Sequence, residues 1–288
     1  MSISRRFHRS CLVILMLCCT CSVELLHAQA LPPSKPLPPT TQEHREIIRK
    51  ARAAYYNLKS RGLAGFEANV QPNWKLVLKD QYAANAPGAD AAVKILNGIK
   101  FTASLDSAGA LKVTHEATIA APNEKAAAGL TQVFGGMEQA LTGFFDTWSP
   151  FMLFSPFPES NGSFRLQDVD GQYRIFYKED GVDIVTAMTK DFYISETKTS
   201  TAEFTSSLKP KFKKIPQGLI LVGYDAGYEG TGGTDVTKLS VIVEYQEIDG
   251  LQLLTKLNLA GSFQATPGDP KSAFEVELAF NQYKVKTQ

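Results

Sequence analysis

The sequence predicts a mainly β fold of the α+β class, in which a strongly curved antiparallel sheet wraps around helices. From Ser163 onward, apolar and polar residues alternate with the two-residue period of strands. Turn signals such as Asp170-Gly171 separate these runs, as in hairpins. Strands with one apolar and one polar face form a sheet whose apolar side needs a cover, and two upstream segments with helical periodicity can supply it.

The first 30 residues have the organisation of a secretory signal peptide. A basic start at Arg5 to Arg9 precedes an apolar run over residues 11–26 and a small-residue cleavage site at Ala28-Gln29-Ala30. The apolar run is shorter than the roughly 18 residues that span a bilayer, and Glu24 interrupts it. We expect export with cleavage after Ala30; the alternative is a retained anchor.

Composition excludes several classes of protein. All four cysteines lie within the expected signal peptide, so the mature chain is expected to contain no disulfide. The chain has 30 Lys and Arg residues and 29 Asp and Glu residues, of which three basic residues and one acidic residue lie in the expected signal peptide. The mature chain therefore has 27 basic and 28 acidic residues. This balance disfavours nucleic-acid binding, which needs a clustered positive field.

Sequence signatures of catalysis and metal binding are also missing. Only His44 and His115 remain after processing, and there is no H-E-x-x-H pattern for zinc. No G-x-S-x-G nucleophile elbow occurs, and the glycine-rich stretch Gly230 to Gly233 lacks the Lys and Ser/Thr of a phosphate loop. We therefore expect no enzyme, no metal and no cofactor.

The mature chain is expected to begin with a linker and a helix. Leu31 to Thr41 is proline-rich, which favours an extended linker, and residues 42–288 are expected to form a single domain. Thr40-x-x-Glu43 is a potential capping box, and Gly62 suits the residue just past the helix end. The apolar face of this helix comprises Ile47, Ile48, Ala51, Ala54, Tyr55 and Leu58.

Short elements follow this helix. Leu63–Gln71 is predicted to be a strand, Trp74–Leu78 is ambiguous, and Ala89–Asn97 has the pattern of a short helix. Ile99–Leu105 and Leu111–Ile119 are predicted to be strands joined by a turn.

The central segment Leu130–Pro158 is unusually apolar and begins as a helix that should stop at Pro150. Its glycines lower the stability of the helix by up to about 1 kcal/mol each, so the helix depends on packing. The segment is either ordinary core or a mobile lid over an apolar ligand. The face expected to be core comprises Leu130, Phe134, Met137, Leu141 and Phe144.

The second half of this segment supplies the candidate binding site. Large apolar residues continue past Pro150, where a helix no longer explains their spacing. The residues expected to contact a ligand are Phe144, Phe145, Trp148, Phe151, Met152 and Phe154.

The remaining chain is predicted to be almost wholly strands. A bulge is expected near Asn281-Gln282, because Tyr283 and Val285 change parity relative to the preceding residues. The expected strands are Phe164–Val169, Tyr173–Lys178, Val182–Met188, Phe192–Lys198, Glu203–Lys213, Leu219–Tyr228, Val236–Ile248, Leu251–Phe263 and a last strand over Phe274–Phe280.

Three local motifs have two interpretations each. Lys209–Lys214 suits either anionic headgroups or a protected edge strand carrying Lys and Pro. Asp168-x-Asp170-Gly171 is either the start of a calcium loop or a plain turn. Asn161-Gly162-Ser163 is either a glycosylation sequon or a turn.

Two regions of sequence carry a family resemblance. Ala51-Arg52-Ala53-Ala54-Tyr55-Tyr56 leads into Leu63-Ala64-Gly65-Phe66-Glu67-Ala68 near the start of the mature chain. Glu244-Tyr245-Gln246-Glu247-Ile248-Asp249-Gly250-Leu251 and Phe280-Asn281-Gln282-Tyr283-Lys284-Val285 lie near its end. In this organisation the chain resembles the outer-membrane lipoprotein carrier (LolA/LolB-like) superfamily.

This resemblance implies an unclosed antiparallel β half-barrel, with helices covering its concave side and an apolar cavity between them. It implies a periplasmic, non-enzymatic protein that binds acyl chains of lipids or lipoproteins, as a carrier or chaperone in envelope biogenesis. The alternative is a structural or regulatory envelope protein that contacts an inner- or outer-membrane protein through the same fold. A third hypothesis is an exported hydrolase without a recognisable motif.

Overall fold

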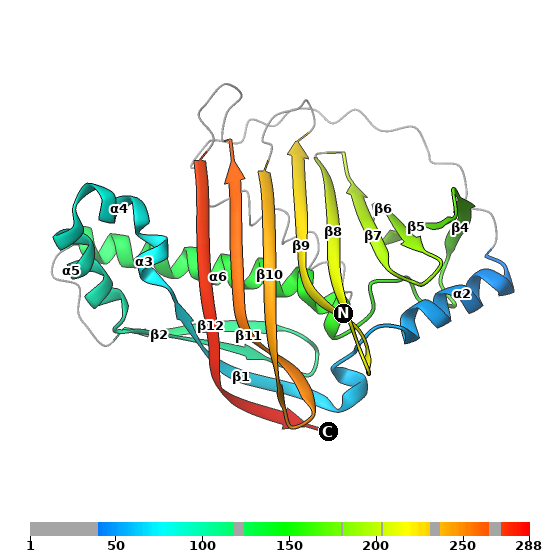
Figure 1. The fold of residues 1–288 in the computed structure, drawn as a ribbon, viewed down its shortest axis with the longest axis horizontal. Helices are drawn as coiled ribbons and strands as arrows, with labels where there is room; N and C mark the ends of the chain where they lie inside the picture. Colours follow the sequence, from blue (N-terminus) through cyan, green and yellow to red (C-terminus); the bar gives the residue numbers. More distant parts are fainter. Residues whose placement is uncertain (1–39, 118–123, 180, 203, 231–236, 265–271) are drawn as a thin grey trace.

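The computed structural model describes most of the chain as one antiparallel sheet of 12 strands with few helices (Figure 1). The sheet is not closed into a barrel, because its strand order has two ends, β3 and β4. The mainly β, antiparallel prediction is confirmed. The expected signal peptide and most of the linker lie outside the described residues, which are 40–117, 124–179, 181–202, 204–230, 237–264 and 272–288.

The strand order is that of an up-and-down meander with one long connection. Consecutive strands are neighbours throughout, except that β3 and β4 lie at opposite edges, while the first strand pairs with the last. The strands are β1 (Leu63–Pro72), β2 (Ile99–Leu105), β3 (Leu111–Ala117), β4 (Phe164–Val169), β5 (Gln172–Glu179), β6 (Val182–Thr189), β7 (Ile194–Ser200), β8 (Phe204–Ile215), β9 (Gly218–Gly230), β10 (Thr237–Ile248), β11 (Leu251–Phe263) and β12 (Ser272–Thr287).

The helices lie before and between the strands (Figure 1). Trp74–Leu78, which the pattern left ambiguous, is helical for most of its length, and the predicted helix at Ala89–Asn97 is confirmed. The helices are α2 (Gln42–Ala53), the 3-10 turn η1 (Lys59–Arg61), α3 (Trp74–Val77), α4 (Lys79–Ala84), α5 (Ala86–Leu96) and α6 (Glu124–Met152).

The first helix differs from its prediction at both ends. The hydroxyl of Thr41, one residue after the expected cap, accepts the backbone N–H of His44. The helix ends at Ala53 because the chain then pairs with β9: Leu219 N–H donates to the carbonyl of Ala54 at 2.8 Å. Gly62 instead ends the 3-10 turn, at φ 89°.

The long helix α6 connects the two edges of the sheet. Its 29 residues correspond to about 43 Å at ~1.5 Å per residue. The prediction that it stops at Pro150 is wrong, because the helix continues to Met152. Proline costs an intrahelical hydrogen bond there, but the carbonyl of Ser149 still accepts from the N–H groups of Leu153 and Phe154 at 2.8 and 3.1 Å.

The expected bulge in the last strand is present. Glu67 of β1 pairs with Lys284 and Asn69 pairs with Asn281, so β12 has one extra residue between these pairs. Gln282 adopts a positive φ of 53° there. The extra residue restores the inward position of the following side chains.

The core lies between α6 and one face of the sheet, called here the inner face. Figure 1 shows α6 running across the strands, and Phe145 packs against both Phe66 and Phe280, with ring centroids 6.1 and 6.2 Å apart. Of the helix face expected to be core, Met137, Leu141 and Phe144 are buried, whereas Leu130 and Phe134 are half-buried at its margin.

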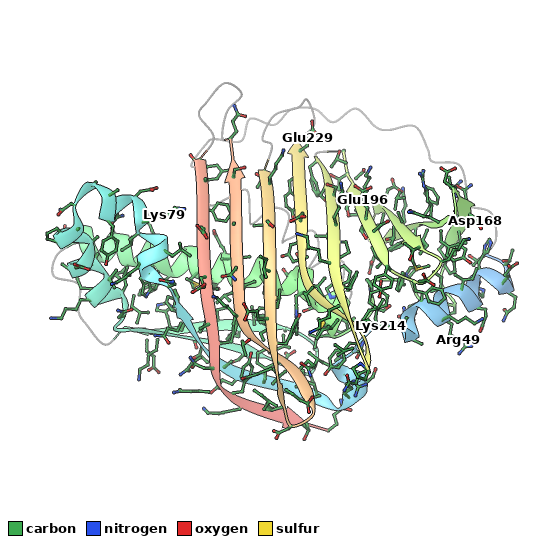
Figure 2. All side chains as sticks on the ribbon, in the orientation of Figure 1. Arg49, Lys79, Asp168, Glu196, Lys214 and Glu229 are labelled. Atoms are coloured by element: carbon green, nitrogen blue, oxygen red, sulfur yellow. The ribbon has the colours of Figure 1, made fainter. Side chains whose placement is uncertain are left out.

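Charged side chains lie on the outside, as Arg49 on α2 and Lys79 on α4 illustrate (Figure 2). Beyond Leu208, the described pairing of β8 is with β9 alone, as the edge-strand interpretation of Lys209–Lys214 expects. In the described part of the chain, no helix has both the length and the apolarity that crossing a bilayer requires.

Two further motifs lie in turns. Asp170 and Gly171 have φ of 52° and 76° and connect β4 to β5, so Asp168-x-Asp170-Gly171 forms a hairpin. The carboxylate of Asp168 forms a salt bridge with Lys190. Asn161-Gly162-Ser163 precedes β4 in a turn, and Gly230 to Gly233 lies mostly outside the described residues.

Candidate functional site

A cavity of about 550 Å³ lies beside the C-terminal end of α6. Its volume is within the ~300–1,000 Å³ range of small-molecule sites. Its roof is the last turn of α6 together with the segment after it, residues 153–163, called here the capping segment. Its floor is the inner face of β5–β8, and α2 contributes to the rim. The lining residues are Arg52, Pro150, Phe151, Phe154, Ser155, Pro156, Phe157, Pro158, Glu159, Gly162, Ser163, Tyr177, Lys178, Glu179, Ile184, Thr197, Thr199 and Leu208.

The register of the strands places the floor on the same face as the core. Leu208 pairs with Ala226 of β9 and with Thr197 of β7, and directly paired residues share a face. Tyr224 is two residues from Ala226 along β9, so the two side chains share a face. The hydrogen bond between the side chains of Tyr224 and Thr147 of α6 identifies this face as the inner one. The cavity therefore continues the space that α6 fills further along the sheet.

The roof is made of aromatic and proline side chains. Phe151, Phe154 and Phe157 line the cavity together with three prolines. Phe157 is also packed edge-on against Tyr55 of the segment after α2, with ring centroids 5.3 Å apart. The proline-rich sequence explains why the capping segment has no regular secondary structure, since proline lacks the N–H that helices and strands need.

Hydrogen bonds from one arginine of α2 hold the middle of the capping segment. The guanidinium of Arg52 donates to the carbonyls of Phe157 and Pro158 at 3.1 and 3.0 Å. It also forms a salt bridge with Glu159 at 3.0 Å. The planar guanidinium suits this arrangement because it donates several hydrogen bonds in fixed directions.

Other polar side chains hold the two ends of the same segment. Arg45 donates to the carbonyl of Ser160 at 2.5 Å, and the amide of Asn57 donates to the carbonyl of Phe154 at 2.5 Å. Just beyond the segment, Thr40 donates to the carbonyl of Phe164, the first residue of β4, at 2.6 Å. The roof is thus positioned by polar side chains on and around α2.

The six residues predicted to contact a ligand are divided between the cavity and the core. Phe151 and Phe154 line the cavity and belong to its roof. The remaining four are buried between α6 and the sheet: Phe144, Phe145, Trp148 and Met152.

The polar part of the floor was not predicted from the sequence. Inward positions of β6–β8 carry hydroxyls where β10–β12 carry aliphatic side chains. The alternation of the strands contained this signal, since Thr197 and Thr199 occupy the positions that apolar residues occupy elsewhere. The hydroxyl-bearing residues of this part of the inner face are Tyr177, Thr186, Thr197, Thr199 and Ser206, called here the hydroxyl patch.

The largest member of the hydroxyl patch is Tyr177. Burial raises the pKa of Tyr177 far above the usual value, and Glu179 adds to this effect, while a hydrogen bond with Thr186 opposes it. A tyrosine phenol is neutral at physiological pH even with its ordinary pKa of about 10. Tyr177 therefore carries a proton that it can donate at the floor of the cavity.

Charged side chains also line the cavity: Arg52, Glu159, Lys178 and Glu179, the last of which is near enough to Tyr177 to raise its pKa. Lys178 pairs with Asp183 at 3.4 Å, and Arg52 is neutralised by Glu159. Among the described residues, no group of three or more His, Cys, Asp or Glu side chains is placed to bind a metal ion.

Comparison of the chain with protein-family models, with curated proteins and with solved structures finds no match.

Proposed function

We propose that the protein is a periplasmic, non-enzymatic binding protein for acyl chains of lipids or lipoproteins, acting as a carrier or chaperone in envelope biogenesis. The observation that supports this most directly is the cavity beneath Phe151 and Phe154. In this proposal the sheet acts as a strongly curved half-barrel of the lipoprotein-carrier type, with α2 and α6 on its concave side.

The energetics of an apolar cavity suit an acyl chain. Burial contributes about 0.8 kcal/mol per methylene, so a chain of roughly 16 carbons gains on the order of 10 kcal/mol. The costs of association and of ordering the chain reduce this gain.

Entry and exit of the chain would follow from how the capping segment is held. Its contacts with Arg52 and Arg45 are hydrogen bonds from half-exposed side chains, and water can replace those of Arg52 at a cost of about 1.5–3 kcal/mol. Lifting the segment would uncover Phe154 and Phe157 without unfolding any strand. The capping segment, rather than the helix α6, is therefore the proposed lid.

Uptake of a fluorescent fatty acid by the purified chain, together with native mass spectrometry of material from the envelope, tests the proposal. The blocked variant is Leu208→Trp, which fills the floor of the cavity. The control is Ile242→Trp, because Ile242 is 53% exposed on the outer face. We expect saturable uptake by the wild type and the control, and little by the blocked variant. The absence of both co-purified lipid and uptake would overturn the proposal.

A second candidate is a structural or regulatory envelope protein that contacts a membrane protein. The burial of Phe144, Phe145 and Trp148 favours it, because these aromatics fill the space that a larger ligand would need. It predicts that crosslinking in cells captures an inner- or outer-membrane protein. It also predicts that Leu208→Trp leaves this capture unchanged.

A further inference from the structure

The chemistry of the cavity floor specifies the ligand more closely. We propose that the cavity selects acyl chains whose carbonyl accepts hydrogen bonds from Thr197 and Thr199, as in an acyl ester or amide. This inference rests on the proposed function and adds the part of the ligand that the hydroxyl patch would recognise.

The hydroxyls of the patch are adjacent across three strands. Thr186 of β6 pairs with Thr197 of β7, and Thr199 pairs with Ser206 of β8. Thr186, Thr199 and Ser206 are buried at 0%, 4% and 8% exposure. Thr197 and Thr199 both line the cavity, two residues apart on the same face of β7. A ligand in the cavity therefore meets two neighbouring hydroxyls.

The floor contains a connected chain of donors. The hydroxyl oxygens of Thr186 and Thr197 are 3.4 Å apart, and Thr186 is also hydrogen-bonded to Tyr177. Tyr177 is diagonal to Thr186 across β5 and β6, within the reach of an aromatic side chain. Each hydroxyl donates one proton and accepts up to two. When neutral Tyr177 donates to Thr186 and Thr186 donates to Thr197, the proton of Thr197 is directed to the cavity.

The position of these hydroxyls within the sheet supports a role in recognition. Inward positions of β10, β11 and β12 carry Val241, Leu257 and Leu278, which α6 and its aromatics cover. The hydroxyls occur where the covering helix has ended and the cavity begins. A ligand that is only hydrocarbon would displace water from Thr197 and Thr199 and give them no acceptor in return. A carbonyl replaces the lost water.

A matched pair of lipids tests the inference. A monoacylglycerol and the corresponding alkylglycerol ether have the same chain and headgroup, and differ in the carbonyl. Their dissociation constants are measured for the wild type and for the double variant Thr197→Val and Thr199→Val, which keeps the β-branched shape of both side chains. The control is Thr205→Val, because Thr205 is exposed on the opposite face of β8. Circular dichroism and thermal unfolding establish that each variant is folded.

The inference predicts that the wild type and the control bind the ester about tenfold more tightly than the ether, as expected for one to two hydrogen bonds. The double variant should bind both lipids equally, with its affinity for the ether unchanged or increased. Equal binding of ester and ether by the wild type would overturn the role of the hydroxyls and leave acyl binding intact. Binding of neither lipid, together with no uptake of the fluorescent fatty acid, would overturn the proposed function as well.

Discussion

The indole Nε1 of Trp148 donates a hydrogen bond of 3.0 Å to the hydroxyl oxygen of Tyr245, which joins α6 to β10. Trp148 is completely buried, and burial raises the pKa of Tyr245. Pro150 and the capping segment follow Trp148 directly. This hydrogen bond therefore fixes the point from which the roof of the cavity begins.

Replacing Tyr245 by Phe should destabilise the protein by about 1–3 kcal/mol, because the buried indole N–H is left without an acceptor. Urea denaturation monitored by fluorescence measures the change. The matched control is Tyr82→Phe, whose hydroxyl bonds to Asp90 at 2.8 Å in an exposed position, and its effect should stay within about 0.5 kcal/mol. Equal losses in the two variants would show that burial of the Trp148 partner is unimportant.

The glycines of α6 should be replaceable where their surroundings are open. A Cβ built at Gly135 meets no atom within 4 Å, so Gly135→Ala should stabilise the protein by about 0.5–1 kcal/mol. Thermal unfolding measures this gain. The control is Gly62→Ala, which also has open space but a φ of 89° and should therefore be destabilising. A loss of stability in Gly135→Ala would indicate that α6 requires flexibility at this point.

Removing the guanidinium of Arg52 should loosen the capping segment. In Arg52→Met, the carbonyls of Phe157 and Pro158 lose their donor, and the free energy of opening should fall by about 1.5–3 kcal/mol. Hydrogen exchange of residues 155–163 measures this change. The control is Arg49→Met, since Arg49 bonds to Glu46 of its own helix. Unchanged exchange in the Arg52 variant would contradict the account of how the roof is held.

Loosening should also affect the binding of ligand. If the capping segment is the lid, Arg52→Met should accelerate both uptake and release of a fluorescent fatty acid. The equilibrium affinity should change less than either rate, because Arg52 contributes only part of the rim.

Stability should fall steeply in alkaline solution. Burial raises the pKa of Tyr55, Tyr177, Tyr224, Tyr245 and Tyr283 in the folded protein. Their unfolded pKa is about 10, so above that pH the unfolded chain releases protons that the folded chain retains. The contribution of these tyrosines is complete below about pH 10 and is lost as the pH rises above it.

Spectrophotometric titration of the tyrosines measures this effect. The phenols of Tyr55, Tyr177, Tyr224, Tyr245 and Tyr283 should lose their protons only together with unfolding. A single smooth titration of all of them without loss of structure would contradict the burial of these side chains in solution.

The sequence predicted most strands because their pattern is local. Alternation over Leu251–Phe263 and the change of parity at Tyr283 gave β11 and the bulge of β12. Contacts between distant segments were not predictable in this way. The end of α2 depends on Leu219, which lies more than 150 residues further along the chain.

The candidate site likewise contains residues that local sequence could predict and residues that only distant contacts bring together. The apolar residues Phe151 and Phe154 were expected at a ligand site from their position past a proline, and they line the cavity. The donors that hold the roof, and the hydroxyls of the floor, become neighbours of these residues only through the pairing of β5–β8 and the docking of α2. Arg52 appears in the sequence as one of several bases on a helix, so its contacts with Phe157 and Pro158 had no local signal.

Photocrosslinking can show whether an acyl chain occupies the cavity beneath the capping segment. A fatty acid with a diazirine in its chain is bound, irradiated and located by mass spectrometry of peptides. We predict labelling of the roof at Phe151 and Phe154 and of the floor at Ile184, with loss of labelling in Leu208→Trp. Labelling confined to the outer face of the sheet, or labelling that persists in the blocked variant, would contradict the account.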